Sequence, residues 1–228
     1  SSVDFAPDTL NNYMFNKGTD IALDKYTSFT VSIERTYQGE GYGGTTTEVY
    51  RFDTENEVGS RQISYVPQNE SGSAAGTENF RYSEPNVTVE KFVNGTDVSY
   101  RKSLAPHTDG PVPLSENRFP RMSLFTQHIN STSFVEYDNR HGQRVGVYEI
   151  SEDSLDSNDY YGNTILSLSG TYEITNQRGV IYTDESLTYE IDASDDNQVV
   201  TSEQKIEISD FNSTDVERPE WYDAALES

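Results

Sequence analysis

Apolar and polar side chains alternate along most of the chain after residue 26. In the stretch YTSFTVSIERTY, Phe29, Val31 and Ile33 fall on one side, with hydroxyl and charged side chains between them. The same period of two recurs at Tyr50 and Phe52, Ile63 and Tyr65, Phe80 and Tyr82, Val87 and Val89, Val98 and Tyr100, and in further segments from Phe134 to Ile208. Because this period is typical of half-buried strands, the pattern predicts an antiparallel sheet of about ten strands.

Turn-forming residues separate these segments. Asn94-Gly95-Thr96 is a strong hairpin signal, and the run from Gly39 to Gly44 predicts a second turn. Four of the eight prolines lie between Ser103 and Pro120, so this segment is predicted to be a crossing loop rather than a strand.

Two segments have helical patterns. Asp8 to Lys25 is expected to form a leading helix, and Arg121 to Ile129 a short inserted helix. A strongly twisted sheet of this size tends to curl, and the two helices are candidates to fill its hollow. We therefore expect a mainly β (α+β) fold, a large curved sheet or half-barrel. It is expected to form one domain over residues 1–228, with a helical segment at 1–26 and a tail at 209–228.

The charge balance excludes one class of partner and indicates a habitat. The formal net charge of -23 makes nucleic acid an unsuitable partner, because a phosphate backbone needs a basic surface. Eleven of the sixteen basic residues are Arg and five are Lys. Acid excess with scarce Lys is typical of proteins from salt-saturated habitats, where molar salt screens self-repulsion. An ordinary acidic secreted protein is the alternative.

The chain has no cysteine, so it offers no disulfide and no thiolate site. No apolar run is long enough for a membrane span or a signal peptide. Membrane association is therefore expected only through an N-terminal anchor that preceded Ser1. Five glycosylation sequons, at Asn69, Asn86, Asn94, Asn130 and Asn212, weakly favour an extracytoplasmic location, either at the cell surface or secreted.

A search for catalytic and metal-binding patterns predicts no enzyme, no cofactor and no metal site. His107, His128 and His141 lack metal-ligand spacing, and we interpret each as a surface or capping residue. The glycines from Gly39 to Gly44 precede a strand, whereas a phosphate loop precedes a helix. Acidic clusters at residues 151–159 and 192–196 do not match a calcium loop and are expected to be solvated.

The end of the chain carries a resemblance. Its sequence IEISDFNSTDVERPEWY, residues 206–222, resembles the closing strand and tail of a family of haloarchaeal surface lipoproteins of unknown function. That family is similar to the LolA and LppX group of lipid and lipoprotein carriers, which implies a half-barrel closed by helices. The lipid-modified cysteine of a lipoprotein is absent here. Trp221, the single Trp, is expected to pin the tail onto the sheet.

Two functions are compatible with the apolar alternation. In the first, the protein carries a lipid or lipid-modified protein in a hollow lined by Phe29, Val31, Ile33, Phe52, Tyr65, Tyr82 and Tyr100. In the second, the helices cover these side chains and the protein is a self-associating subunit of a surface assembly. The alternation shows that one face of each strand is buried, but it does not show whether a ligand or the protein itself covers that face. The many Tyr side chains on the inner faces favour a partly polar hollow.

Overall fold

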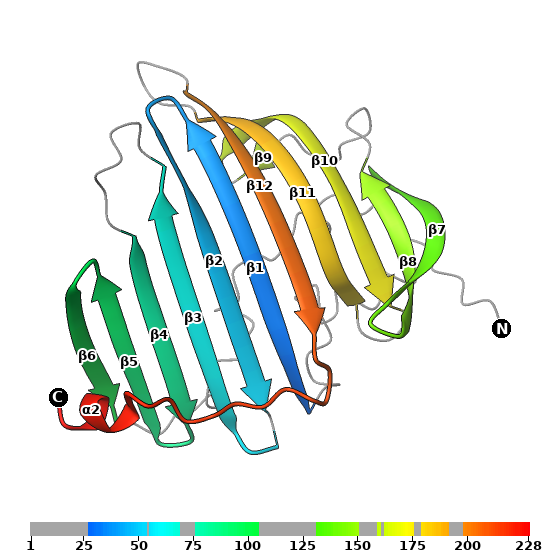
Figure 1. Ribbon diagram of the computed structural model, residues 1–228. Helices are drawn as coiled ribbons and strands as arrows, with labels where there is room; N and C mark the ends of the chain where they lie inside the picture. The colour runs from blue at the N-terminus through cyan, green and yellow to red at the C-terminus, as the bar shows by residue number, and fades with distance from the viewer. Residues whose placement is uncertain are drawn as a thin grey trace. The chain divides into compact units, whose positions relative to one another are not determined.

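The computed structural model describes residues 27–53, 55–68, 76–104, 131–150, 159–160, 162–175, 179–191 and 198–228. Within them the protein is mainly β (Figure 1). The strands are β1 (Ser28–Gly39), β2 (Tyr42–Asp53), β3 (Val58–Pro67), β4 (Thr77–Glu84), β5 (Val87–Asn94), β6 (Asp97–Ser103), β7 (Thr132–Arg140), β8 (Gln143–Ile150), β9 (Asp159–Tyr160), β10 (Asn163–Thr175), β11 (Gly179–Ile191) and β12 (Gln198–Ser209). A short helix, α2 (Tyr222–Leu226), follows them.

Hydrogen-bonded neighbours follow the order β6-β5-β4-β3-β2-β1-β12-β11-β10-β8-β7, and β9 pairs with β10. The pairs from β2 to β6 and from β7 to β12 are antiparallel. Among the described strands β6 and β7 end this order without pairing to each other, so the sheet is open. The prediction of a mainly β, antiparallel fold is confirmed, whereas the half-barrel shape stays a prediction.

The predicted turns lie where the sequence placed them. Asn94 pairs with Asp97 across the loop between β5 and β6, and Gly95 at its first central position has a φ of 60°. A side chain at that φ would be strained, which is why glycine suits this hairpin. A turn at Glu40 and Gly41 likewise separates β1 from β2.

The described residues divide into two compact units. Unit 1 contains residues 35–41 and the described residues from 131 to 207. Unit 2 contains residues 27–34, the described residues from 42 to 104, and residues 208–228. Strands β1 and β12 each contribute residues to both units, so no single linker separates them along the chain. The expectation of a single domain stays a prediction.

Strand register fixes which side chains of Unit 2 share a face. Tyr50 pairs with Arg61, Arg61 with Arg81, and Arg81 with Glu90. Directly paired residues point to the same side of a sheet, and the next residue along each strand points to the other. We call the side with Tyr50, Arg61, Arg81 and Glu90 face A, and the opposite side, which carries Tyr82, face B.

The C-terminal residues cover part of face B. Tyr82, Val89, Tyr222 and Ala225 form a buried cluster, and Trp221 packs against it. The helix α2 lies beside β5 and β6 (Figure 1). The predicted role of Trp221 as a packing anchor is confirmed, whereas the tail was not predicted to contain a helix.

Unit 1 has its own core between β8, β10 and β11. It is built from aliphatic and aromatic side chains, namely Tyr148, Ile150, Ile165, Leu168, Tyr172, Ile174, Val180 and Leu187. The predicted helices at Asp8 to Lys25 and Arg121 to Ile129, and the predicted loop from Ser103 to Pro120 beyond residue 104, lie outside the described residues.

Candidate functional site

All seven residues predicted to line the hollow belong to Unit 2, but they do not share one face. Phe52 and Tyr65 lie on face A, because Phe52 follows Tyr50 by two positions and Tyr65 follows Arg61 by four. Tyr82 pairs with Ser60, next to Arg61, and therefore lies on face B. Tyr100 pairs with Lys91, next to Glu90, and lies on face B as well.

The apolar part of face A is centred on β1 and β2. The rings of Phe29 and Phe52 are 4.9 Å apart between centroids, which places Phe29 on face A. Val31 and Ile33 alternate with Phe29 along β1 and share its side. All four side chains are buried, with exposed fractions of 2% or less. The structure thus brings together the four most apolar of the predicted residues.

Tyr65 packs onto backbone. A methyl group at Gly44 would lie 2.5 Å from the Tyr65 ring, so this ring rests against β2 at a position where any side chain would collide with it. Tyr65 therefore lies on face A with its ring packed against the backbone of β2.

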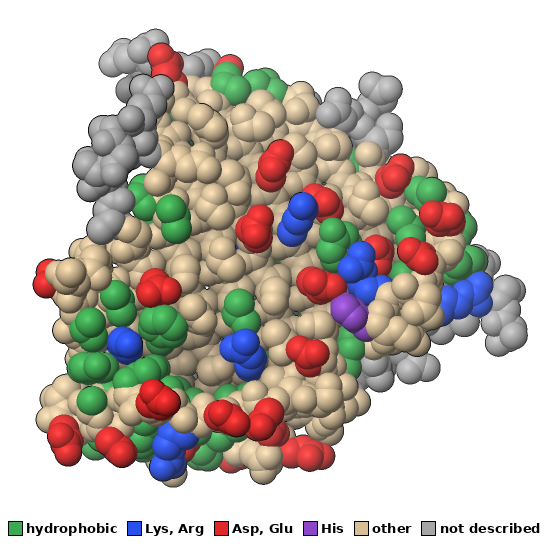
Figure 2. All heavy atoms as spheres, in the orientation of Figure 1, with side chains coloured by type: hydrophobic (Ala, Val, Ile, Leu, Met, Phe, Trp, Pro, Cys, Tyr) green, Lys and Arg blue, Asp and Glu red, His purple; other side chains and the backbone are tan. Residues whose placement is uncertain are grey.

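Tyr82 and Tyr100 take part in packing at the C-terminal helix. Tyr82 meets the Tyr222 ring edge-on at 5.7 Å between centroids, and Tyr100 packs against the same buried cluster. Figure 2 shows hydrophobic side chains gathered over this part of the molecule, with carboxylates along its lower edge. These two tyrosines contribute to holding α2 in place.

A row of polar side chains crosses face A next to the apolar residues. Tyr50 stacks on Phe52 at 6.2 Å between centroids and donates a hydrogen bond of 2.5 Å to Glu48. Arg81 donates to Glu90 Oε1 through Nε at 2.7 Å, and its Nη2 lies 2.5 Å from the same oxygen. Sequence reasoning missed this row, because single charged residues within alternating strands resemble solvent-facing positions.

Arg61 stands in the middle of this row. Its Nη2 donates to Asn79 Oδ1 at 2.5 Å and lies 3.7 Å from Glu90 Oε1. Burial lowers the pKa of Arg61, and the neighbouring positive charge of Arg81 lowers it further, although Tyr50, Glu90 and Glu48 act in the opposite direction. Face A therefore holds a partly buried cation beside its apolar surface.

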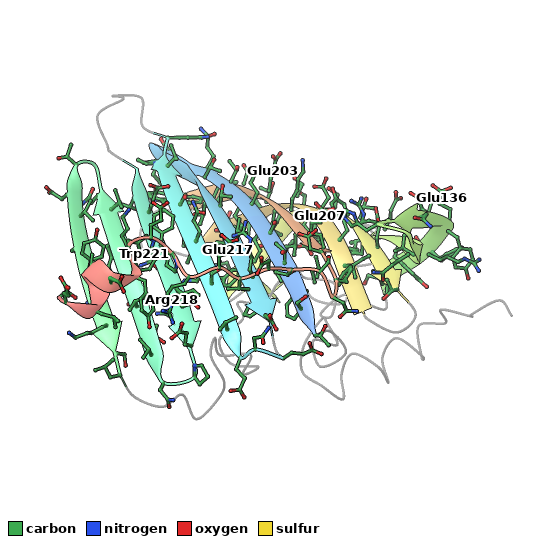
Figure 3. All side chains as sticks on the ribbon, turned by 60° about the horizontal axis from the view of Figure 1, so that its bottom comes forward. Glu136, Glu203, Glu207, Glu217, Arg218 and Trp221 are labelled. Atoms are coloured by element: carbon green, nitrogen blue, oxygen red, sulfur yellow. The ribbon has the colours of Figure 1, made fainter. Side chains whose placement is uncertain are left out.

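The segment from Asp210 to Trp221, here called the strap, connects β12 to α2. Asn212 N–H donates to Ser28 O at 2.7 Å, and Thr214 N–H donates to Ser28 Oγ at 3.0 Å. Further along, Arg218 Nη2 donates to Glu84 at 2.5 Å. Figure 3 shows Arg218 and Trp221 on the strap beside α2.

Unit 1 carries a separate charged cluster at the hairpin between β7 and β8. Arg140 forms two hydrogen bonds to the buried Glu173 and one of 3.1 Å to Glu207. His141 is exposed and its Nε2 lies 2.8 Å from Glu207 Oε1, so the prediction of a surface histidine is confirmed for this residue. His107 and His128 lie outside the described residues.

Three of the five sequons fall on described residues. Asn86 and Asn94 are exposed at the ends of hairpins, where a glycan has room. Asn212 is exposed too, although its side-chain oxygen accepts hydrogen bonds from Thr27 N–H and Thr27 Oγ1 at 2.9 and 3.0 Å. Asn69 and Asn130 lie outside the described residues.

Neither a metal site nor a membrane helix is found in the part of the chain that the structure describes. No three potential metal-ligating side chains come together there. The helical segment described is too short to cross a bilayer. The acidic cluster at 192–196 and all of the cluster at 151–159 except Asp159 lie outside this part of the chain.

Comparison with known proteins finds likenesses among solved structures only. No protein-family model matches the chain, and no curated protein matches it in sequence. The crystal structure of a DUF1329 family protein from Desulfovibrio piger aligns with 95% of this chain and 94% of its own, at 10% identity and a TM-score of 0.29. At so low a score the likeness supports no particular function.

Proposed function

We propose that this protein is a non-enzymatic carrier that binds a lipid, or the lipid of a modified protein, on face A of Unit 2. The observation that supports the proposal is the amphipathic character of this face. Buried Phe29, Val31 and Phe52 lie at one side of it, and a row that includes Tyr50 and Arg61 adjoins them. An amphiphile needs both kinds of surface next to each other.

Because the apolar residues of face A are buried, a lipid can reach them only by displacing other contacts. Because Phe29, Val31 and Phe52 are already buried, an acyl chain has to replace contacts that these side chains make within the protein. Each CH₂ group removed from water contributes about 0.8 kcal/mol to the binding free energy. An acyl chain of many CH₂ groups can therefore offset the loss of the contacts that it replaces. Resemblance of the tail to surface lipoproteins, and through them to the LolA and LppX carriers, favours the same function.

The setting we propose is extracytoplasmic, at the surface of a cell adapted to high salt. The net charge of -23 and the scarcity of Lys favour such a habitat. Exposed Asn86 and Asn94 are suitable glycan acceptors in that location. Membrane association would come from an anchor outside the described residues.

A structural role in a surface assembly is the second candidate, and one observation favours it. Phe134, Val135 and Tyr137 on β7 are 46%, 48% and 40% exposed. β7 also ends the strand order, with β8 as its neighbour. An edge strand with exposed apolar side chains is a surface on which another chain can pair.

Mass spectrometry of an organic extract distinguishes the two functions. The protein is purified natively in molar salt, and a denatured and refolded sample serves as the control. A carrier yields a stoichiometric lipid that is lost on denaturation. An empty extract, combined with self-association that increases with protein concentration, would replace the carrier with the structural role.

A further inference from the structure

Among the described residues, two buried donors on face A make no hydrogen bond. Arg61 Nε and Asn79 Nδ2 are buried atoms, and neither makes a hydrogen bond in the part of the chain that the structure describes. A buried donor without a partner is unfavourable by about 1–3 kcal/mol, and more where the group is charged. Native proteins rarely keep such groups, and a pair of them on neighbouring strands is therefore informative.

The two donors belong to side chains that contact each other. Arg61 Nη2 donates to Asn79 Oδ1 at 2.5 Å, which fixes the amide orientation because the opposite one would set two donors face to face. Asn79 Nδ2 is consequently directed away from Arg61 Nη2, and both of its N–H groups need another acceptor. One oxygen-rich group beside these side chains would satisfy Asn79 Nδ2 and Arg61 Nε together.

The charges nearby favour an anion as that group. Glu90 pairs with both Arg61 and Arg81, and Arg81 makes its closest contacts, at 2.5 and 2.7 Å, while Glu48 acts on Arg61 only through its charge. Arg61 is left 3.7 Å from Glu90, which is beyond hydrogen-bond distance. A guanidinium that is not hydrogen-bonded to a carboxylate pairs well with carboxylate or phosphate oxygens, with which it forms shorter and stronger bonds than with water.

The position of the pair relates this anion to the apolar part of face A. Arg61 pairs with Tyr50, and Tyr50 stacks on Phe52, whose ring contacts Phe29. We propose that Arg61 and Asn79 bind the acidic head group, a carboxylate or a phosphate, of an amphiphile whose hydrocarbon chain lies against Phe29, Val31 and Phe52. This inference rests on the proposed carrier function and adds the chemical class of its ligand.

The test uses dodecyl phosphate, dodecanol and inorganic phosphate as probes, titrated into the full chain in molar salt by calorimetry. The wild type is expected to bind dodecyl phosphate about tenfold or more tightly than dodecanol, the preference that charge-assisted hydrogen bonds of 1.4 kcal/mol or more provide. Inorganic phosphate alone is expected to bind more weakly than dodecyl phosphate, because it lacks the hydrocarbon chain.

Two variants with the same change in charge test whether the preference for the phosphate head group depends on Asn79. Asn79→Asp places a carboxylate beside Arg61 and is expected to remove the preference for dodecyl phosphate over dodecanol. Gln62→Glu adds the same charge one residue from Arg61, on face B, and is expected to keep the preference. Asn79→Asp satisfies Arg61 from within the protein, so its fold is expected to be at least as stable as the wild type.

The other outcomes would contradict the head-group site, the amphiphilic ligand or the carrier function. Equal affinity for dodecyl phosphate and dodecanol, or an unchanged preference in Asn79→Asp, contradicts the head-group site and leaves the carrier function standing. Inorganic phosphate that binds as tightly as dodecyl phosphate identifies a free-anion site and overturns the amphiphile. Failure of both dodecyl compounds to bind overturns the carrier function together with this inference.

Discussion

Glu84 accepts hydrogen bonds from three parts of Unit 2. Tyr82 Oη on β4 and Tyr222 Oη on α2 each donate at 3.1 Å, and Arg218 on the strap donates through Nη2 and Nε at 2.5 and 3.1 Å. Burial alone would raise the pKa of Glu84, but hydrogen bonds from Arg218, Tyr222 and Tyr82 outweigh it and lower the pKa. This carboxylate therefore connects the C-terminal segment to the sheet most strongly while it is ionised.

The lowered pKa of Glu84 gives stability a pH dependence of known sign. Because the folded pKa lies below the ordinary value of 4.5, the contribution of Glu84 is fully present above that value and is lost as pH falls through the folded pKa. Glu84→Gln is expected to reduce the free energy of unfolding at pH 7 and to flatten its decline between about pH 5 and pH 3, measured by urea denaturation. Glu217→Gln, which removes an exposed strap carboxylate, is the control. Identical acid profiles for the two variants would contradict the role of Glu84.

The residue scale also shows where sequence reasoning fails. Tyr65 and Tyr82 both occupy apolar positions in alternating strands, yet they lie on opposite faces because Tyr82 pairs with Ser60 rather than with Arg61. Alternation within one strand says nothing about its register against the next, and a shift of one residue reverses the face. For the same reason the row through Arg61 and Glu90 could not be predicted.

At the scale of elements, the strap and α2 are the parts that the sequence predicted least completely. The tail did predict that Trp221 packs, since Trp side chains are mostly buried on average. The helix itself is five residues long and lacks a side-chain cap, so its local sequence gives little signal. Packing of Tyr222 and Ala225 against Tyr82 and Val89 is what stabilises it.

A pair of neighbouring alanines tests the docking of α2. Ala225 is 0% exposed and Ala224 is exposed on the same helix. Ala225→Gln is expected to destabilise the fold by about 1–3 kcal/mol because the larger side chain has no room in the cluster. It should also shift the fluorescence emission of Trp221, the single Trp, to longer wavelength. Ala224→Gln should leave both unchanged. Equal effects in the two variants would show that α2 does not dock through Ala225.

At the scale of the whole molecule, the alternating pattern predicted the fold class because an antiparallel sheet leaves a period of two in its strands. The hairpin at Gly95 was predictable because a turn residue with a positive φ is usually glycine. Of the residues predicted to line the hollow, Phe29, Val31, Ile33 and Phe52 do lie together, whereas their role in binding stays a prediction. The polar half of the candidate site was not predicted, because which charges face each other depends on strand register.

Photolabelling with a fatty acid that carries a diazirine on its hydrocarbon chain tests the carrier most directly. Trypsin cleavage after Lys25, Arg35, Arg51 and Arg61 separates the peptide of Phe29, Val31 and Ile33 from the peptide of Phe52, and both from the peptide of β7. A carrier that uses face A is labelled on residues 26–35 and 52–61, and excess unlabelled fatty acid removes the label. Label confined to the β7 peptide, or equal in native and denatured protein, would contradict the proposed function.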